Sequence, residues 1–196
     1  MNQKPNIFIR EATAEDAAAI LEIYAPYVKN TAITFEYDVP TLEEFAERIT
    51  NIKKRHPYLV AEMDGKIVGY TYAQPFKTRA AYAWSVETSI YVRSDRKRSG
   101  IGSRLYRALE DILRAQHVVN LYACIAYPQV EDEYLSKDSA VFHERQGYTL
   151  AGTFQECAYK FGKWYGLICM EKHLDDHRMP NPPFIAFDEA KKKLGY

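Results

Sequence analysis

Basic residues gather around two glycines in one short segment, and this is the strongest chemical signal in the sequence. Within or just after residues 91–104 stand Arg93, Arg96, Lys97, Arg98, Arg104 and Arg107, with a single acidic residue, Asp95, among them. Gly100 and Gly102 mark the point where a strand-like alternation gives way to a helical pattern. Backbone N–H groups and the positive helix end can point at one anion there, and glycines let a phosphate approach the backbone. The segment therefore predicts a site for a diphosphate group.

Two common phosphate loops do not fit this segment. A Walker A loop needs Gly-x-x-x-x-Gly-Lys-Ser/Thr, and the dinucleotide fingerprint needs a third glycine where Leu105 stands. A basic helix start exposed to solvent is the plainest alternative and stays open. The run 97–102, Lys-Arg-Ser-Gly-Ile-Gly, matches the pyrophosphate loop of acyl-CoA-dependent N-acyltransferases, Arg/Gln-x-x-Gly-x-Gly/Ala. Lys97 replaces the usual Arg or Gln, and lysine remains a phosphate-binding cation.

Acyl transfer to an amine needs a base, and Glu87 is the candidate. The ammonium must lose a proton before the nitrogen can attack a thioester. Glu87 lies within the alternating run Val86-Glu87-Thr88-Ser89-Ile90, where a carboxylate is out of character. Half-buried there, it would have a pKa raised toward the operating pH. The alternative is that Glu87 faces solvent or pairs with a neighbouring arginine.

His143 is a second candidate, because an imidazole titrates near neutrality and could protonate the leaving thiolate. The alternative is a structural histidine packed beside the cofactor. The other histidines, His56, His117, His173 and His177, have no comparable context and are expected to be structural or solvated. No His/Cys/Asp/Glu cluster has the spacing of a zinc site, so we expect no metal. No serine stands in the context of a nucleophile.

The composition is that of an ordinary globular protein. The chain has 196 residues, 47% of them hydrophobic, with 26 basic and 26 acidic side chains and therefore no net charge. This excludes a disordered or fibrous chain and predicts no general attraction to nucleic acid or to an anionic membrane. No apolar run approaches the roughly 20 residues of a membrane helix. With no signal-peptide core and three cysteines at irregular spacing, a cytoplasmic protein is expected.

Hydrophobic periodicity and capping patterns predict one mixed α/β domain. Helices are expected at residues 17–28, 41–54, 101–113 and 139–146, and strands at 7–10, 58–63, 66–73, 83–92, 118–125, 148–157 and 164–171. Asp64-Gly65 predicts a tight hairpin, and Gly147 suits the left-handed position after a helix. The proline-containing tail from Asp175 cannot form one regular element. The sequence does not decide whether this tail packs on its own domain or on a partner.

In these motifs the chain resembles the GNAT acetyltransferase superfamily, and within it the phosphinothricin/methionine sulfone acetyltransferase group. Besides the glycine loop, the resemblance is carried by the runs 9–13, 31–36, 69–70, 75–79, 86–92, 142–148 and 159–164. It implies the GNAT fold, a mixed central sheet of about seven strands flanked by helices. It covers most of a domain at residues 1–174, followed by a C-terminal extension at 175–196. The insertion 127–137 lies outside it.

The resemblance also implies a cofactor and a set of roles. Acetyl-CoA would be bound by the backbone of Ile90, Tyr91 and Val92 and by the loop Lys97, Arg98, Ser99, Gly100, Ile101, Gly102 and Ser103. Glu87 would act as the base, directly or through water, and His143 as the acid. Phe35, Glu36, Lys77 and Arg79 would contact a small-molecule amine, with Glu36 able to hold its ammonium. A homodimer is expected.

Three functions remain open from sequence. The first is acetylation of the α-amine of a small amino-acid analogue such as phosphinothricin, methionine sulfoximine or methionine sulfone. The second is the same chemistry on another amine or an antibiotic, because Lys77 stands where the group has an arginine that can clamp an oxyanion bidentately. The third is a non-catalytic acyl-CoA sensor, which would need neither Glu87 nor His143. Ser136 replaces an asparagine that is frequent in the family, so the cofactor exit could differ locally.

Overall fold

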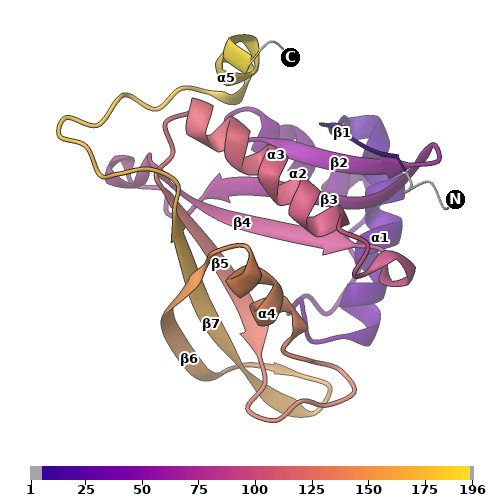
Figure 1. Ribbon diagram of the computed structural model, residues 1–196. Coiled ribbons are helices and arrows are strands. Elements are labelled where there is room, and N and C mark those ends of the chain that lie inside the picture. The colour runs from indigo at the N-terminus through magenta and orange to yellow at the C-terminus, as the bar shows by residue number, and fades with distance from the viewer. Residues whose placement is uncertain (1–5, 195–196) are drawn as a thin grey trace, which may run out of the picture.

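One seven-stranded sheet organises the part of the chain that the computed structural model describes, residues 6–194. The strand order is β1-β2-β3-β4-β5-β7-β6 (Figure 1). The strands are β1 (Ile7–Glu11), β2 (Tyr58–Met63), β3 (Lys66–Pro75), β4 (Ser85–Val92), β5 (Asn120–Tyr127), β6 (Thr149–Lys160) and β7 (Lys163–His173). The helices are α1 (Ala17–Asn30), α2 (Leu42–Lys53), α3 (Ile101–Ala115), α4 (Asp138–Arg145) and α5 (Phe187–Leu194). The predicted fold class is confirmed, with α5 as an unpredicted addition.

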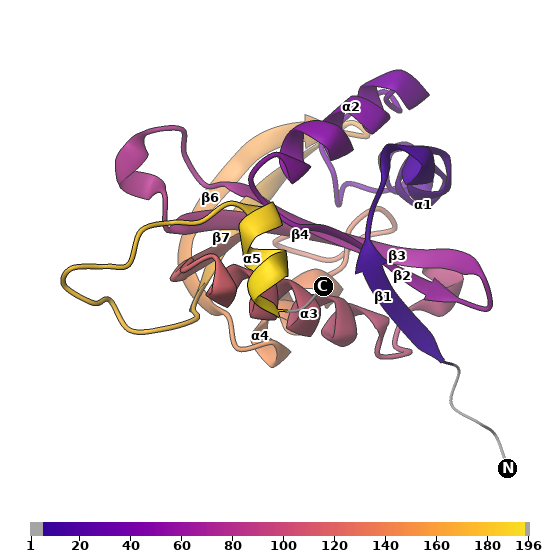
Figure 2. The same cartoon turned by 90° about the horizontal axis from the view of Figure 1, so that it is seen from above.

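Helices cover both faces of the sheet, and each face has its own core. Figure 2 shows α1 and α2 on one side and α3 and α4 on the other. On the α3 side, the apolar stripe of that helix, including Leu105 and Leu109, packs on Val86 and Leu121. On the α1 side, the core is rich in aromatic side chains: Tyr24, Tyr27, Phe45, Tyr58 and Tyr70. Burial of these apolar surfaces drives the association of the layers.

Local signals act where the sequence predicts them. The amide of Glu44 donates to the hydroxyl of Thr41 at 3.2 Å, and the Glu44 carboxylate accepts from the Thr41 amide at 2.9 Å. This reciprocal capping box starts α2. Asp64 and Gly65 have φ of 53° and 72°, as a two-residue hairpin turn between β2 and β3 requires. Gly147 follows α4 with φ of 89°.

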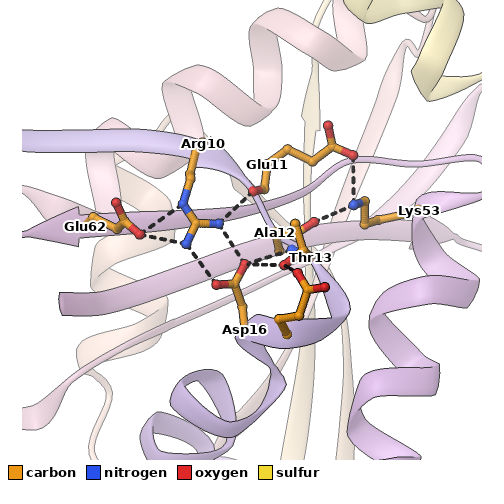
Figure 3. A network of polar contacts seen from close by, with 8 residues as sticks. Arg10, Glu11, Ala12, Thr13, Asp16, Lys53 and Glu62 are labelled. Carbon is orange, nitrogen blue, oxygen red and sulfur yellow. Dashed lines mark hydrogen bonds and ion pairs between the residues drawn. The ribbon is translucent and has the colours of Figure 1, made fainter. Parts of the chain in front are cut away.

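A polar network ties the first strand to both helices of its face (Figure 3). The guanidinium of Arg10 contacts both carboxylate oxygens of Asp16, at 2.7 and 2.8 Å, and Glu62 at 2.6 Å. Lys53 of α2 pairs with Glu11 at 2.8 Å. Hydrogen bonding to Arg10 lowers the pKa of Asp16 below its usual range. Because Asp16 immediately precedes α1, the network sets the angle at which the chain enters that helix.

The C-terminal tail packs on its own domain. After an irregular stretch, α5 places Phe187 and Ala190 in the core beside α3, where they are 1% and 0% exposed. Lys191 pairs with Glu11 at 2.7 Å, which joins the tail to the network around β1. Between residues 6 and 194, no helix has the length and apolar character needed to cross a bilayer.

Candidate active site

The site begins where two neighbouring strands part. β4 and β5 run parallel but pair only at Ser85–Asn120, Val86–Leu121 and Glu87–Tyr122. Figure 1 shows them starting side by side and then spreading apart. β5 continues by pairing with β7, and β4 by pairing with β3. Beyond Glu87, the edge of β4 that faced β5 therefore has no strand to bond with.

A cavity lies between the separated parts of β4 and β5. Ser89, Ile90 and Tyr91 of β4 line one wall, and Cys124 and Ala126 of β5 line the other. Ser139 and His143 of α4 contribute to the lining as well. An extended ligand with amide groups can pair with the open edge of β4 as an added strand would. The predicted backbone contacts at Ile90 and Tyr91 thus face the cavity. Val92 is not among the lining residues, and its carbonyl accepts a hydrogen bond from the Tyr27 hydroxyl at 2.5 Å.

The glycine loop connects β4 to α3. Gly100 is the N-cap of α3 with φ of 83°, a left-handed conformation that favours glycine. A Cβ built on Gly100 would meet no atom within 4 Å, so open space lies before the helix N-terminus. Arg98 also has a positive φ, 61°, and its side chain is 88% exposed. A loop with free space and exposed cations at a helix N-terminus fits a diphosphate.

Gly102, unlike Gly100, lies against a neighbouring helix. A Cβ at this position would come within 3.0 Å of the ring of Phe142 on α4. Its missing side chain therefore permits close packing of α3 against α4, the helix that contributes Ser139 and His143 to the cavity lining. The side chain of Ile101 is also unavailable to a ligand, because it is 1% exposed and packs in the core. Only the backbone of these two residues can contribute to anion binding.

The remaining side chains of the loop contact several neighbouring residues. Lys97 Nζ stands 5.5 Å from the centre of the Tyr27 ring, and Arg98 lies 3.7 Å from Asp138. The hydroxyl of Ser99 donates to the Arg96 carbonyl at 2.6 Å. Ser103 accepts a hydrogen bond at 3.1 Å from Gln146, the residue that follows α4. These contacts are exposed, so a bound anion can replace them at little cost.

Glu87 belongs to the last residue pair before the strands separate. Its side chain is half-buried on the sheet face that carries Tyr72 and Tyr122. Burial raises the pKa of the Glu87 carboxyl above its ordinary value, and the positive charge of Lys77 acts in the opposite direction. A carboxylate with a raised pKa beside a cavity is suited to accept a proton near neutral pH.

The predicted acceptor residues lie on two loops, and the charge of one of them, Lys77, acts on the Glu87 carboxyl. Lys77 and Arg79 follow β3 and are exposed, with Lys77 Nζ 4.8 Å from the centre of the Phe76 ring. Phe35 packs beside Ala126 of β5 and is only partly buried. Phe76 in turn stacks on Tyr122, the register partner of Glu87. Both loops thus contact side chains of β5.

Glu36 is already paired, with a residue that sequence reasoning missed. One oxygen of its carboxylate accepts from Arg48 of α2 at 2.8 Å. The other is buried and has no hydrogen-bond partner within residues 6–194. Arg48 lies on the charged face of α2, and no pattern in the sequence separates it from the other charges there. An acceptor ammonium can donate a hydrogen bond to this unpartnered oxygen.

His143 is buried and fully hydrogen-bonded. Its Nδ1 lies 2.7 Å from the carbonyl oxygen of Ser139, an atom that can only accept, so Nδ1 carries the proton. Nε2 lies 2.7 Å from the hydroxyl of Tyr106, which must then be the donor. Burial lowers the pKa of His143 to about 4, against the effect of the Ser139 hydrogen bond. In this arrangement neither nitrogen holds a proton free for a leaving thiolate, and the ring connects α4 to α3.

Other predicted features can be checked in the same region. Within the described part of the chain, no three His, Cys, Asp or Glu side chains are grouped as a metal site would require. The three cysteines are free, with the sulfurs of Cys124 and Cys169 separated by 3.6 Å on neighbouring strands. Tyr106, which the sequence analysis did not single out, is a polar contact of the site through His143.

Comparison with known proteins identifies relatives over most of the chain. The sequence profile of the acetyltransferase (GNAT) domain matches residues 9–168. The phosphinothricin N-acetyltransferase of Streptomyces viridochromogenes is 35% identical, with 89% of this chain and 90% of the relative covered. The L-methionine sulfoximine/L-methionine sulfone acetyltransferase of Pseudomonas aeruginosa is 33% identical, covering 87% and 96%.

A solved structure shares the arrangement of elements. The crystal structure of a GNAT superfamily phosphinothricin acetyltransferase from Sinorhizobium meliloti, in complex with AcCoA, superposes with a TM-score of 0.80. The two sequences are 29% identical, and the match covers 92% of this chain and 98% of the other.

The hydrogen bonds of His143 predict its tautomer and its titration. We expect a neutral ring protonated on Nδ1 at pH 7, titrating near 4 instead of at the ordinary value of 6.5. Because the unfolded chain binds this proton more tightly, His143 makes the fold less stable as pH falls from 6.5 toward 4. Nitrogen NMR of ¹⁵N-histidine-labelled protein measures both properties, and His143→Asn assigns the signal. An Nε2-protonated ring, or titration near 6.5, would contradict the assignment.

Proposed function

The chain belongs to the GNAT acetyltransferase family, and we propose that it transfers the acetyl group of acetyl-CoA to the α-amine of a small amino-acid analogue. The observation that carries this proposal is the position of Glu87, at the last pair of β4 and β5 and beside the cavity that opens beyond it. A pure acyl-CoA sensor would need no half-buried carboxylate there, and the relatives are named as enzymes.

Residues on two elements would hold acetyl-CoA, which supplies an acyl group already activated as a thioester. The loop 97–103 and the N-terminus of α3 would bind the diphosphate through backbone N–H groups and the charges of Lys97 and Arg98. The open edge of β4 at Ser89–Tyr91 would bind the extended arm between diphosphate and thioester. Backbone N–H groups of that edge are the donors available to a carbonyl oxygen as negative charge develops on it.

Glu87 would take the proton that the acceptor ammonium must lose. Its raised pKa makes it a better base near neutrality than an ordinary carboxylate, and its partial burial limits competition from water. The proton passes directly or through one water molecule. For this role the carboxyl must be ionised, so kcat/KM should rise with pH through the pKa of Glu87.

For His143 we propose that the ring positions α4 against α3 and does not act as the acid that the sequence predicted. Its two hydrogen bonds connect α4 with Tyr106 of α3, and they hold the α4 wall of the cavity against that helix. Tyr106 OH also lies 3.4 Å from the Thr88 hydroxyl on β4, so the three elements share one buried network. The thiolate would leave toward solvent at the mouth of the cavity without a proton from this ring.

The nature of the acceptor rests on the relatives. Phosphinothricin and methionine sulfoximine, named for the Streptomyces and Pseudomonas proteins, are both amino acids with a tetrahedral phosphorus or sulfur group. Lys77 and Arg79 are the cations available to bind an anionic group of such an acceptor. Lys77 cannot form the bidentate contact of an arginine, and for that reason another small α-amine is the second candidate.

Thiol release from acetyl-CoA tests the acceptor class. We expect turnover with phosphinothricin, methionine sulfoximine or methionine sulfone at least tenfold above a panel of ordinary amino acids and amine antibiotics. Release of free CoA measured with a thiol reagent follows the reaction, and mass spectrometry identifies the N-acetyl product. Turnover confined to another amine would refute the proposed class of acceptor and would still support acetyl transfer from acetyl-CoA.

Replacement of Glu87 tests the base. In Glu87→Gln the amide cannot accept the proton, so kcat should fall by about 10²-fold, and the rate that remains should rise with pH only as the acceptor ammonium loses its own proton to solvent. Steady-state rates with saturating acetyl-CoA between pH 6 and 9 measure both effects. Glu144→Gln, an exposed position on α4, is the matched control and should keep the wild-type rate. A decrease below tenfold would show that another group is the base.

We further propose that two copies associate through the hairpin of β6 and β7, and that the protein acts in the cytoplasm, where its cysteines stay reduced. β6 is the edge strand of the sheet and is exposed along most of its length. Large apolar side chains on the hairpin face solvent: Leu150, Phe154, Tyr159 and Trp164 are between 48% and 61% exposed. An exposed apolar edge strand favours a second copy as its cover.

Charges on this hairpin should prevent the association. Phe154→Glu combined with Trp164→Glu places like charges in the apolar contact, so a dimer should dissociate to monomers. Light scattering after size-exclusion chromatography measures the mass. Phe8→Glu is the matched control, because Phe8 is 60% exposed on β1, the opposite edge of the sheet. A wild-type protein that stays monomeric at 100 μM would refute the proposed dimer.

A further inference from the structure

Lys160 is a buried charge that the proposed chemistry does not use. It is the last residue of β6, a strand whose other side chains are mostly exposed, yet it is only 3% exposed. Its Nζ donates to three backbone carbonyls, those of Val28 at 2.8 Å, Thr31 at 2.9 Å and Thr34 at 2.8 Å. Within residues 6–194, no carboxylate lies within ion-pair distance of it. The three carbonyl oxygens and the ring of Phe161, whose centre is 5.1 Å from Nζ, offset the cost of its burial.

The three contacts require the ammonium form. An ammonium has three N–H donors and no acceptor, and the three carbonyl oxygens take all of them. A neutral amine would leave one carbonyl facing a lone pair. Val28 lies in the last turn of α1, where carbonyls have no partner within the helix and the helix dipole is negative. Lys160 therefore caps the end of α1 from a distant strand.

The other two carbonyls belong to the loop 31–38, which carries two of the proposed acceptor residues. Thr31 begins this loop, and Thr34 immediately precedes Phe35 and Glu36. The hydroxyl of Tyr37 donates to the carbonyl of Tyr159, so the hairpin holds the loop at a second point. One nitrogen thus binds a carbonyl at the end of α1 and two carbonyls of the loop. The loop cannot shift relative to the helix without breaking a charged hydrogen bond.

We propose that Lys160 is a positioning residue for the acceptor: its ammonium holds the loop 31–38 in the conformation that presents Phe35 and Glu36 to the β4–β5 gap. The inference rests on the proposed function for the identity of the acceptor site, but not for the contact between Lys160 and the loop. Acetyl-CoA binding should depend little on Lys160, because the cofactor loop and the open edge of β4 belong to other elements, and Ile33 is the one residue of the loop 31–38 among the residues that line the cavity.

Hydrogen exchange tests the contact without any substrate. In Lys160→Met, which keeps an unbranched side chain but no donor, peptides covering 31–38 should exchange at least tenfold faster than in wild type. Lys163→Met is the matched control, because Lys163 lies on the same hairpin and pairs with Asp132 at the surface. Mass spectrometry of exchanged peptides measures the rates. Unchanged exchange in 31–38, with a folded Lys160→Met protein, overturns the proposal whether or not the protein acetylates any acceptor tested.

Kinetics test the consequence for the acceptor. We expect the acceptor KM of Lys160→Met to rise at least tenfold, with the acetyl-CoA KM changed less than twofold, and Lys160→Arg to recover part of the loss. An equal loss for both substrates indicates a general structural role and overturns the proposal, as does an unchanged acceptor KM. If Lys160→Met does not fold, Tyr37→Phe replaces it. Tyr37→Phe removes the hydroxyl that binds the Tyr159 carbonyl, and exchange of the same peptides should become at least twofold faster. Unchanged exchange would count against the proposal that the hairpin holds the loop 31–38.

Discussion

The parallel pairing of β4 and β5 ends after three residue pairs, and the arrangement of the site depends on this early end. Backbone N–H and C=O groups of a strand need hydrogen-bond partners. Beyond the last shared pair, β4 is bonded to β3 and β5 to β7, so the edges that face each other have no partner strand. The gap leaves an open edge on β4, and Glu87 lies where the two strands begin to separate. The glycine loop follows the far end of that strand, so one strand presents the proposed base, the extended binding edge and the anion site in order.

Buried polar side chains hold the walls of the gap in place. His143 joins α4 to α3, and Lys160 joins the β6–β7 hairpin to the end of α1 and the loop 31–38. Each of these buried nitrogens has all of its hydrogen-bonding capacity used, as the cost of burying polar groups demands. Because hydrogen bonds are directional, these contacts fix the orientation of the elements they join as well as stabilising the fold. Apolar packing alone would allow small shifts of α4 and of the loop, whereas a fully bonded ammonium or imidazole does not.

Much of the fold was predictable because its signals are local. The capping box at Thr41 and Glu44, the hairpin at Asp64-Gly65 and the helix end at Gly147 each act within a few residues. The C-terminal helix escaped prediction because it is only eight residues long and follows several prolines, and its burial comes from contact with α3. For the site, the strand and the glycine loop were recognisable. Arg48, Tyr106 and Lys160 were not, because nothing in their local sequence separates a partner-forming side chain from a solvated one.

By itself the sequence determined the class of chemistry: the loop 97–102 after a long strand, and the ordered motifs of the GNAT family, depend on residue types at short spacing. Only the tertiary structure decided what each residue does. Gly102 serves the packing of Phe142, Val92 is bonded to Tyr27, and both nitrogens of His143 are occupied. The physical reason is that burial and hydrogen-bond partners come from segments far apart in the chain, and they set which protons and lone pairs remain free to react.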